Sequence, residues 1–231
     1  MEYIQILGPN HLLYIAVLIF FTCLLFMNQS YVRDHRNTIS KYIVTISILQ
    51  QILLYGSYVL LGEFTLQESL PFHISRINTI LGIIFLFTKS EKLFNIVAYF
   101  SVFAWLSFLV PSNIEPITHP RGLSFLTNHV ITLLLPFYGM IAYNYKVYAS
   151  ARKRVILLFL VYFVFVALFN PIVNGNYFYL RDKPIFSSVP NIFYYPGSIL
   201  VSILLFFIIE QIFYLVQSKF IHKQTEGRVL L

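Results

Sequence analysis

Residues 152–173 read RKRVILLFLVYFVFVALFNPIV, three consecutive cations followed by a run without any charge. A helix needs about 20 mostly apolar residues to cross the hydrocarbon core of a bilayer. We therefore expect this stretch to contain a membrane span, with the three cations just outside the hydrocarbon core at its N-terminal end.

Similar apolar stretches recur along the 231 residues. We expect spans at residues 11–28, 42–61, 72–88, 93–110, 124–144, 155–173 and 196–217. They are expected to be helices, because irregular backbone facing lipid would leave its polar groups unsatisfied. Seven spans consume most of the chain, so we predict an all-α, multi-pass protein of the cell membrane with one integral membrane domain over residues 1–231.

The distribution of cations predicts the orientation. Most of the 16 Lys and Arg residues fall into four segments that alternate along the chain. These segments contain Arg33, Arg36 and Lys41; Lys89 and Lys92; Lys146, Arg152, Lys153 and Arg154; and Lys219, Lys223 and Arg228. Because cytoplasmic loops carry an excess of Lys and Arg, we predict that the N-terminus lies outside and the C-terminus in the cytoplasm.

Composition excludes several classes of function. Charged residues make up 11% of the chain, against roughly 25% in soluble domains. The net charge of +7 comes from cations next to membrane ends, where anionic lipid head groups account for it, so no nucleic-acid partner is expected. Cys23 is the only cysteine, and no His-Glu-x-x-His motif occurs, so we expect no metal site and no cofactor.

The segment Leu70-Pro71-Phe72-His73-Ile74-Ser75-Arg76 enters the third span from the predicted outer side. His73 and Arg76 are three residues apart and therefore neighbours on a helix surface. Ionisable residues inside a membrane are rare and commonly functional. The alternative is that Arg76 reaches outer phosphates while His73 forms a hydrogen bond at the interface.

Asn128 and His129 lie one turn inside the fifth span, at a depth similar to that of His73. Imidazole titrates near neutral pH, so His73 and His129 are candidates for a base and its partner in acyl or proton transfer. Ser75 is the candidate nucleophile. The alternative is that both histidines and the serine only pack or bond within the bundle.

Further polar residues are expected to bind the substrate together with Arg76 and Asn128. Arg121 lies just before the fifth span, and Asn176, Tyr177 and Lys183 lie in the long outer loop over residues 174–195. Arg181 and Lys183 in this loop break the charge rule, which suggests that they hold a phosphate or a carboxylate. A solvated loop with an Asp182 ion pair is the alternative.

Three motifs carry a family resemblance. They are Leu70-Pro71-x-His73-x-x-Arg76, then Pro120-x-Gly122 leading to His129, then Gly175-Asn176-Tyr177-x-x-Leu180-x-x-Lys183-Pro184. In this order and spacing the chain resembles the bacterial YwaF-like integral membrane proteins, which are common in Gram-positive bacteria.

That family is distantly similar to a eukaryotic transmembrane acyltransferase that acts on phospholipids. The resemblance implies a cysteine nucleophile beside the histidine at the helix entry. Here Phe72 occupies the position before His73, and Ser75 stands where bacterial relatives often carry a cysteine. Acyl transfer would therefore use Ser75 or a water molecule.

The sequence thus predicts an outward-facing polar pocket that acts on a phospholipid or glycolipid by acyl transfer or hydrolysis. A non-enzymatic protein that binds a lipid or docks a membrane-protein partner in a cell-envelope complex is the alternative. A small-solute transporter is a third class. Glu210 is the one obvious polar residue near the inner face that a transport path could use.

Overall fold

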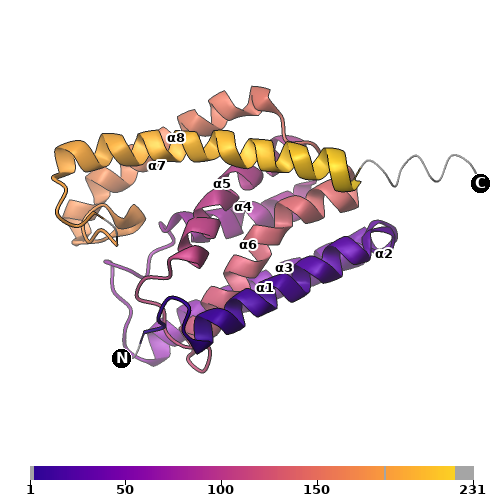
Figure 1. Ribbon diagram of the computed structural model, residues 1–231. Coiled ribbons are helices and arrows are strands. Elements are labelled where there is room, and N and C mark those ends of the chain that lie inside the picture. The colour runs from indigo at the N-terminus through magenta and orange to yellow at the C-terminus, as the bar shows by residue number, and fades with distance from the viewer. Residues whose placement is uncertain (1–2, 185, 222–231) are drawn as a thin grey trace, which may run out of the picture.

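The computed structural model describes residues 3–184 and 186–221, and within them every regular element is a helix (Figure 1). Lys223 and Arg228, assigned above to the cytoplasmic tail, lie outside the described residues. The helices are α1 (Pro9–Met27), α2 (Gln29–Asp34), α3 (Arg36–Leu60), α4 (Ile74–Thr88), α5 (Glu91–Leu109), α6 (Pro120–Tyr143), α7 (Ala149–Val173), η1 (Tyr177–Tyr179), α8 (Asn191–Val216) and η2 (Gln217–Ile221).

Within residues 3–184 and 186–221, six helices are long and apolar enough to cross a membrane: α1, α3, α5, α6, α7 and α8 with its continuation η2. The prediction of a polytopic helical bundle is therefore confirmed. The predicted third span, α4, is an apolar helix of 15 residues. At 1.5 Å per residue it covers about 22 Å, less than the roughly 30 Å hydrocarbon core, and residues 62–73 before it are not helical.

Several predicted boundaries were too narrow. Helix α3 begins at Arg36 rather than residue 42, α7 at Ala149 rather than 155, and α8 at Asn191 rather than 196, with Pro196 inside the helix. Hydropathy marks the part of a helix that lies in hydrocarbon, whereas the helix continues through polar residues beyond it. The long loop is therefore 174–190 and contains the short helix η1.

Helix α6 is the centre of the bundle and packs against α1, α3, α4 and α5. Glycines allow two of these close approaches. A Cβ at Gly82 of α4 would lie 2.7 Å from Leu135 Cδ2, and one at Gly139 of α6 would lie 2.5 Å from Phe94. By contrast, α1, α7 and α8 expose most of their apolar side chains, as expected for helices that face lipid.

The described parts of the four cationic segments, with Lys219 representing the fourth, meet at one end of the bundle, which we call the basic end. There the Tyr138 hydroxyl donates to Arg36 O, the Tyr145 hydroxyl donates to Lys89 O, and Gln217 Nε2 donates to Tyr145 O. Lys89 Nζ also donates to Ser40 Oγ at 3.1 Å, so hydrogen bonds link the described parts of all four segments. The gathering of cations at one end is what a single cytoplasmic face requires.

The basic end also holds α8 in place. Arg152 Nη1 lies 2.8 Å from both carboxylate oxygens of Glu210, and the Tyr99 hydroxyl donates to Glu210 Oε2. Phe213 packs against Phe137 of α6 at a ring separation of 5.3 Å. Glu210, the residue suggested for a transport path, thus joins α8 to α5 and α7.

We predict that Ser188→Cys reacts with an impermeant maleimide in intact cells and that Ser150→Cys does not, both in a Cys23→Ser background. Ser188 lies in the loop opposite the basic end, whereas Ser150 lies in the first turn of α7 at the basic end. The reverse labelling pattern would overturn the orientation.

We also predict that Gly122→Ala lowers the midpoint of thermal unfolding in detergent, with a cost of about 1–3 kcal/mol. A Cβ at Gly122 would overlap the carbonyl oxygens of Glu115 and Pro116, which are backbone and cannot rotate away. The control is Gly56→Ala in α3, where a Cβ meets nothing within 4 Å. Equal midpoints for the two variants would refute this close approach.

Candidate functional site

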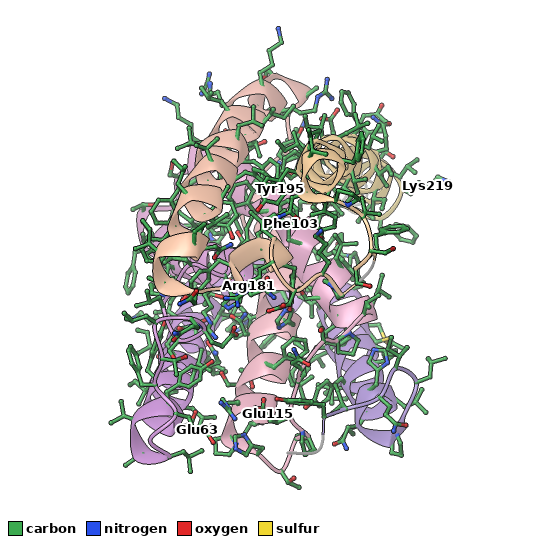
Figure 2. The ribbon with its side chains drawn as sticks, turned by 90° about the vertical axis from the view of Figure 1, so that its left-hand side faces the viewer. Glu63, Phe103, Glu115, Arg181, Tyr195 and Lys219 are labelled. Carbon is green, nitrogen blue, oxygen red and sulfur yellow. The ribbon has the colours of Figure 1, made fainter. Side chains whose placement is uncertain are left out.

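A cavity of about 1070 Å³ occupies the end of the bundle opposite the basic end, which we call the cavity end. Helices α3, α4, α5, α6 and α8 line it, together with the 110–115 linker and the 174–190 loop. Figure 2 looks onto this end, with Glu63 and Glu115 towards one side and Arg181 and Tyr195 towards the other. Its walls combine apolar side chains with a group of ionisable residues.

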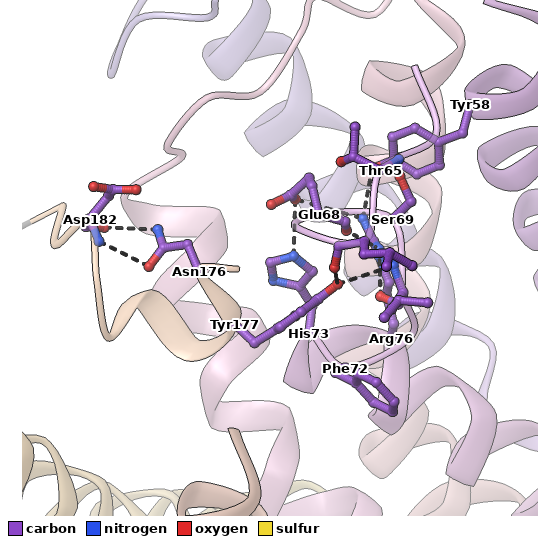
Figure 3. Close-up of polar contacts among 12 residues, drawn as sticks. Tyr58, Thr65, Glu68, Ser69, Phe72, His73, Arg76, Asn176, Tyr177 and Asp182 are labelled. Carbon is purple, nitrogen blue, oxygen red and sulfur yellow. Dashed lines mark hydrogen bonds and ion pairs between the residues drawn. The ribbon is translucent and has the colours of Figure 1, made fainter. Parts of the chain in front are cut away.

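His73 and Glu68 form a carboxylate–histidine pair at the cavity (Figure 3). His73 is the N-cap residue of α4, and its Nε2 lies 3.0 Å from Glu68 Oε1. Burial raises the pKa of Glu68, but the neighbouring His73, Arg76 and Arg121 lower it by a larger amount. The pKa of this carboxyl is therefore below its ordinary value. The contact is an ion-pair distance, because Nε2 has no hydrogen-bond partner among the described residues. In the tautomer that places N–H on Nε2, facing this acceptor, the lone pair lies on Nδ1.

Arg76 holds the 62–73 segment against the bundle. Its Nη1 donates to Glu68 O at 2.7 Å and to Leu70 O at 2.9 Å, and its Nη2 donates to the Tyr58 hydroxyl at 2.8 Å. The guanidinium also lies 3.8 Å from Glu68 Oε1. Arg76 is 8% exposed, so these bonds satisfy a charge largely removed from water.

Tyr177 supports the same segment from the opposite side. Its hydroxyl donates to Leu66 O and accepts from Leu70 N–H, and its ring packs 4.9 Å from that of His73. Burial raises the pKa of Tyr177 to about 12, so the hydroxyl remains a donor at neutral pH. The predicted substrate-binding Tyr177 therefore lies behind His73, where it positions the imidazole.

A second ion-pair group lies beside the first. Arg121 Nη2 lies 2.8 Å from Glu63 Oε2 and 2.6 Å from Glu115 Oε1. Both guanidinium groups lie over the Tyr58 ring, that of Arg121 at 5.5 Å and that of Arg76 at 5.6 Å from its centroid. We call Glu63, Glu68, Glu115, Arg76 and Arg121 the mouth network. Both arginines in it already have carboxylate partners.

His129 lines the cavity from α6 and is 4% exposed. Its Nδ1 lies 2.8 Å from Phe125 O, a pure acceptor, so Nδ1 carries the proton and Nε2 carries the lone pair. Nε2 is buried without a hydrogen-bond partner. Among the described residues, His129 packs on Phe125 and Phe108, whereas His73 packs on Tyr177, so the two histidines lie on different walls of one cavity.

Asn128 and Ser75 also line the cavity. The Thr79 hydroxyl contacts both Asn128 Oδ1 and Ser75 O, which ties α4 to α6. No hydrogen bond joins the Ser75 hydroxyl to either histidine among the described contacts. Phe72, by contrast, packs on Phe165, Phe169 and Tyr177 outside the cavity lining.

The loop residues predicted to bind substrate separate into two groups. Asn176 lines the cavity, and its Oδ1 accepts from the backbone N–H groups of Arg181 and Asp182. Lys183 lies outside the lining, where its Nζ donates to Val189 O at 2.6 Å and stands over the Tyr194 ring. Phosphate binding by Lys183 and Arg76 stays a prediction.

None of the three carboxylates of the mouth network was predicted from the sequence. A signal was present, because Arg76 and Arg121 lie at membrane entries where a cation needs a partner. Glu68 lies shortly before Arg76 in the sequence, and Glu115 lies shortly before Arg121. Their pairing depends on how the 62–73 and 110–119 segments fold back.

We predict that Arg76→Lys lowers the midpoint of thermal unfolding and increases protease cleavage within residues 62–72. A lysine cannot reproduce the fork that binds two carbonyls and a hydroxyl, and the expected cost is about 1–3 kcal/mol. Arg181→Lys is the control, because Arg181 makes an exposed bond to Asn174 O. Unchanged cleavage in Arg76→Lys would contradict this role.

The helices and the embedded cavity define a multi-pass membrane protein with an ionisable site at one end of its bundle. The chain belongs to the TMEM164 family, which it matches over residues 6–214. Neither the curated proteins nor the solved structures contain a match to this chain. The resemblance to YwaF-like proteins and a Gram-positive origin stay predictions.

Proposed function

We propose that the protein binds a phospholipid or glycolipid in this cavity and catalyses acyl transfer or hydrolysis on it. The observation that supports this proposal is the Glu68–His73 pair, 3.0 Å apart, beside a cavity with largely apolar walls among membrane-spanning helices. A carboxylate that orients a histidine is a recurring arrangement for general base catalysis.

In the proposed reaction, His73 Nδ1 takes the proton from the Ser75 hydroxyl or from a water molecule. The resulting oxygen attacks the carbonyl carbon of a lipid ester, and the leaving lysolipid oxygen receives the proton back from His73. Glu68 stabilises the imidazolium that forms in between. With water the products are a fatty acid and a lysolipid, and with Ser75 the acyl group remains on the serine for a second hydroxyl acceptor.

His129 suits a second role in this scheme. Its unpartnered Nε2 can accept a hydrogen bond from a hydroxyl of the lipid or of the acyl acceptor. Arg76 and Tyr177 act on the reaction by holding Glu68 and His73 in place. Arg121, Asn128 and Asn176 line the same cavity as the Glu68–His73 pair and are the proposed contacts to the lipid head group.

The second candidate function is a non-enzymatic lipid-binding or accessory protein of a cell-envelope complex, with a membrane-protein partner. One observation favours it. The Ser75 hydroxyl forms no described hydrogen bond to His73 or His129, so no nucleophile–base pair is preassembled. Such a protein needs the cavity and the mouth network but no base.

The test is mass spectrometry of lipids after the purified protein is incubated with cell lipids. The wild type is expected to form a lysolipid or acylated product, and His73→Ala to slow it by about 10²–10⁴-fold. Ser75→Ala decides between serine and water as nucleophile, and His129→Ala tests the second role.

His35→Ala is the matched control, because His35 is an exposed histidine at the basic end whose Nδ1 contacts Tyr31 O. It should retain full activity. Lipid that remains bound but unchanged in the wild type would contradict the enzymatic proposal and support the accessory protein.

A further inference from the structure

We propose that one face of α8 forms a subsite for a single acyl chain of a membrane lipid, which enters sideways between α8 and α6. This inference rests on the proposed function only in taking a lipid as the ligand. It applies equally to a lipid that is cleaved and to one that is only bound.

The α8 face is defined by Gly197, Val201 and Leu205, which line the cavity at intervals of four residues and therefore share one side of the helix. They span about 12 Å of helix at 1.5 Å per residue. Ser202 lies on the same face, but its hydroxyl donates to Ser198 O at 2.7 Å within the helix. Ser198 also lines the cavity, so this face offers mainly van der Waals contact, with one serine hydroxyl one residue after Gly197.

The opposite wall is apolar as well. Phe103 and Leu106 of α5, Val110 just after it and Phe125 of α6 line the same cavity. Leu106 is 42% exposed and Val110 is 37% exposed, although both border the cavity. Apolar surface of this kind favours an apolar occupant over water.

The proposed side entrance lies where α8 and α6 diverge. Helix α8 packs along α5 and α7, and its described contacts with α6 lie at the basic end, where Phe213 meets Phe137. Figure 1 shows α8 and α6 close together there and diverging towards the cavity end. A lipid tail can therefore reach the cavity from the bilayer, while its head group remains beside Glu68 and His73.

Gly197 provides the sharpest test. A Cβ built there meets no heavy atom within 4 Å, so a larger side chain enters the cavity instead of clashing with protein. Gly56 of α3 is equally free of neighbours but does not line the cavity. Gly197→Leu and Gly56→Leu are therefore a matched pair that differs in whether the cavity is filled.

The experiment delipidates each full-length variant, incubates it with vesicles of short-chain or long-chain phosphatidylcholine, and measures retained lipid by mass spectrometry. Gly197→Leu is expected to retain about tenfold less long-chain lipid than the wild type, with short-chain lipid much less affected. Gly56→Leu should match the wild type. Val201→Phe, one turn further along the same face, repeats the test if Gly197→Leu fails to fold.

Equal long-chain retention in Gly197→Leu and Gly56→Leu would overturn the subsite, as would an equal loss of short and long chains. The outcomes separate this inference from the proposed reaction. Retention that depends on chain length without any product supports the subsite and contradicts catalysis. Product formation that is indifferent to Gly197→Leu supports catalysis and contradicts the subsite.

Discussion

The site depends on how the Arg76 charge is satisfied at the entry to α4. A guanidinium taken out of water is costly unless several hydrogen bonds surround it, and Arg76 obtains them from two loop carbonyls, the Tyr58 hydroxyl and Glu68. The 62–73 segment therefore folds back onto the bundle. As a consequence Glu68 faces His73, the N-cap residue of α4. Tyr177 holds the same segment from the side of the long loop.

The cavity itself follows from an asymmetry between the two ends of the bundle. At the basic end, Glu210 joins α8 to Arg152 of α7 and Tyr99 of α5, and Phe213 packs on α6. No comparable bond between α8 and α6 is described at the cavity end, where α8 leans outward (Figure 1). The opening therefore lies among membrane-spanning helices and beside a polar network. Such a site suits an amphipathic ligand.

Much of the fold could be predicted from the sequence, because span length and cation placement are direct consequences of the bilayer. The same reasoning gave the depth of His73 and His129, and both line one cavity. The neighbours of His73 and His129 could not be predicted, since the depth of a residue along a helix does not determine which wall of the cavity its side chain occupies. Glu68 was missed because its partner is set by the loop that Arg76 folds back. Lys183 was expected to bind substrate, yet it donates to a backbone carbonyl of its own loop.

The central claim is that the cavity holds a membrane lipid with its head group at the Glu68–His73 pair and a chain along α8. The most direct test is a cryo-electron microscopy structure of the protein in lipid nanodiscs, enlarged by a bound antibody fragment. If a lipid is bound as proposed, continuous chain-like density is expected between α8 and α6, ending beside His73. Protein side chains closing that space, or a cavity filled only by water, would contradict it.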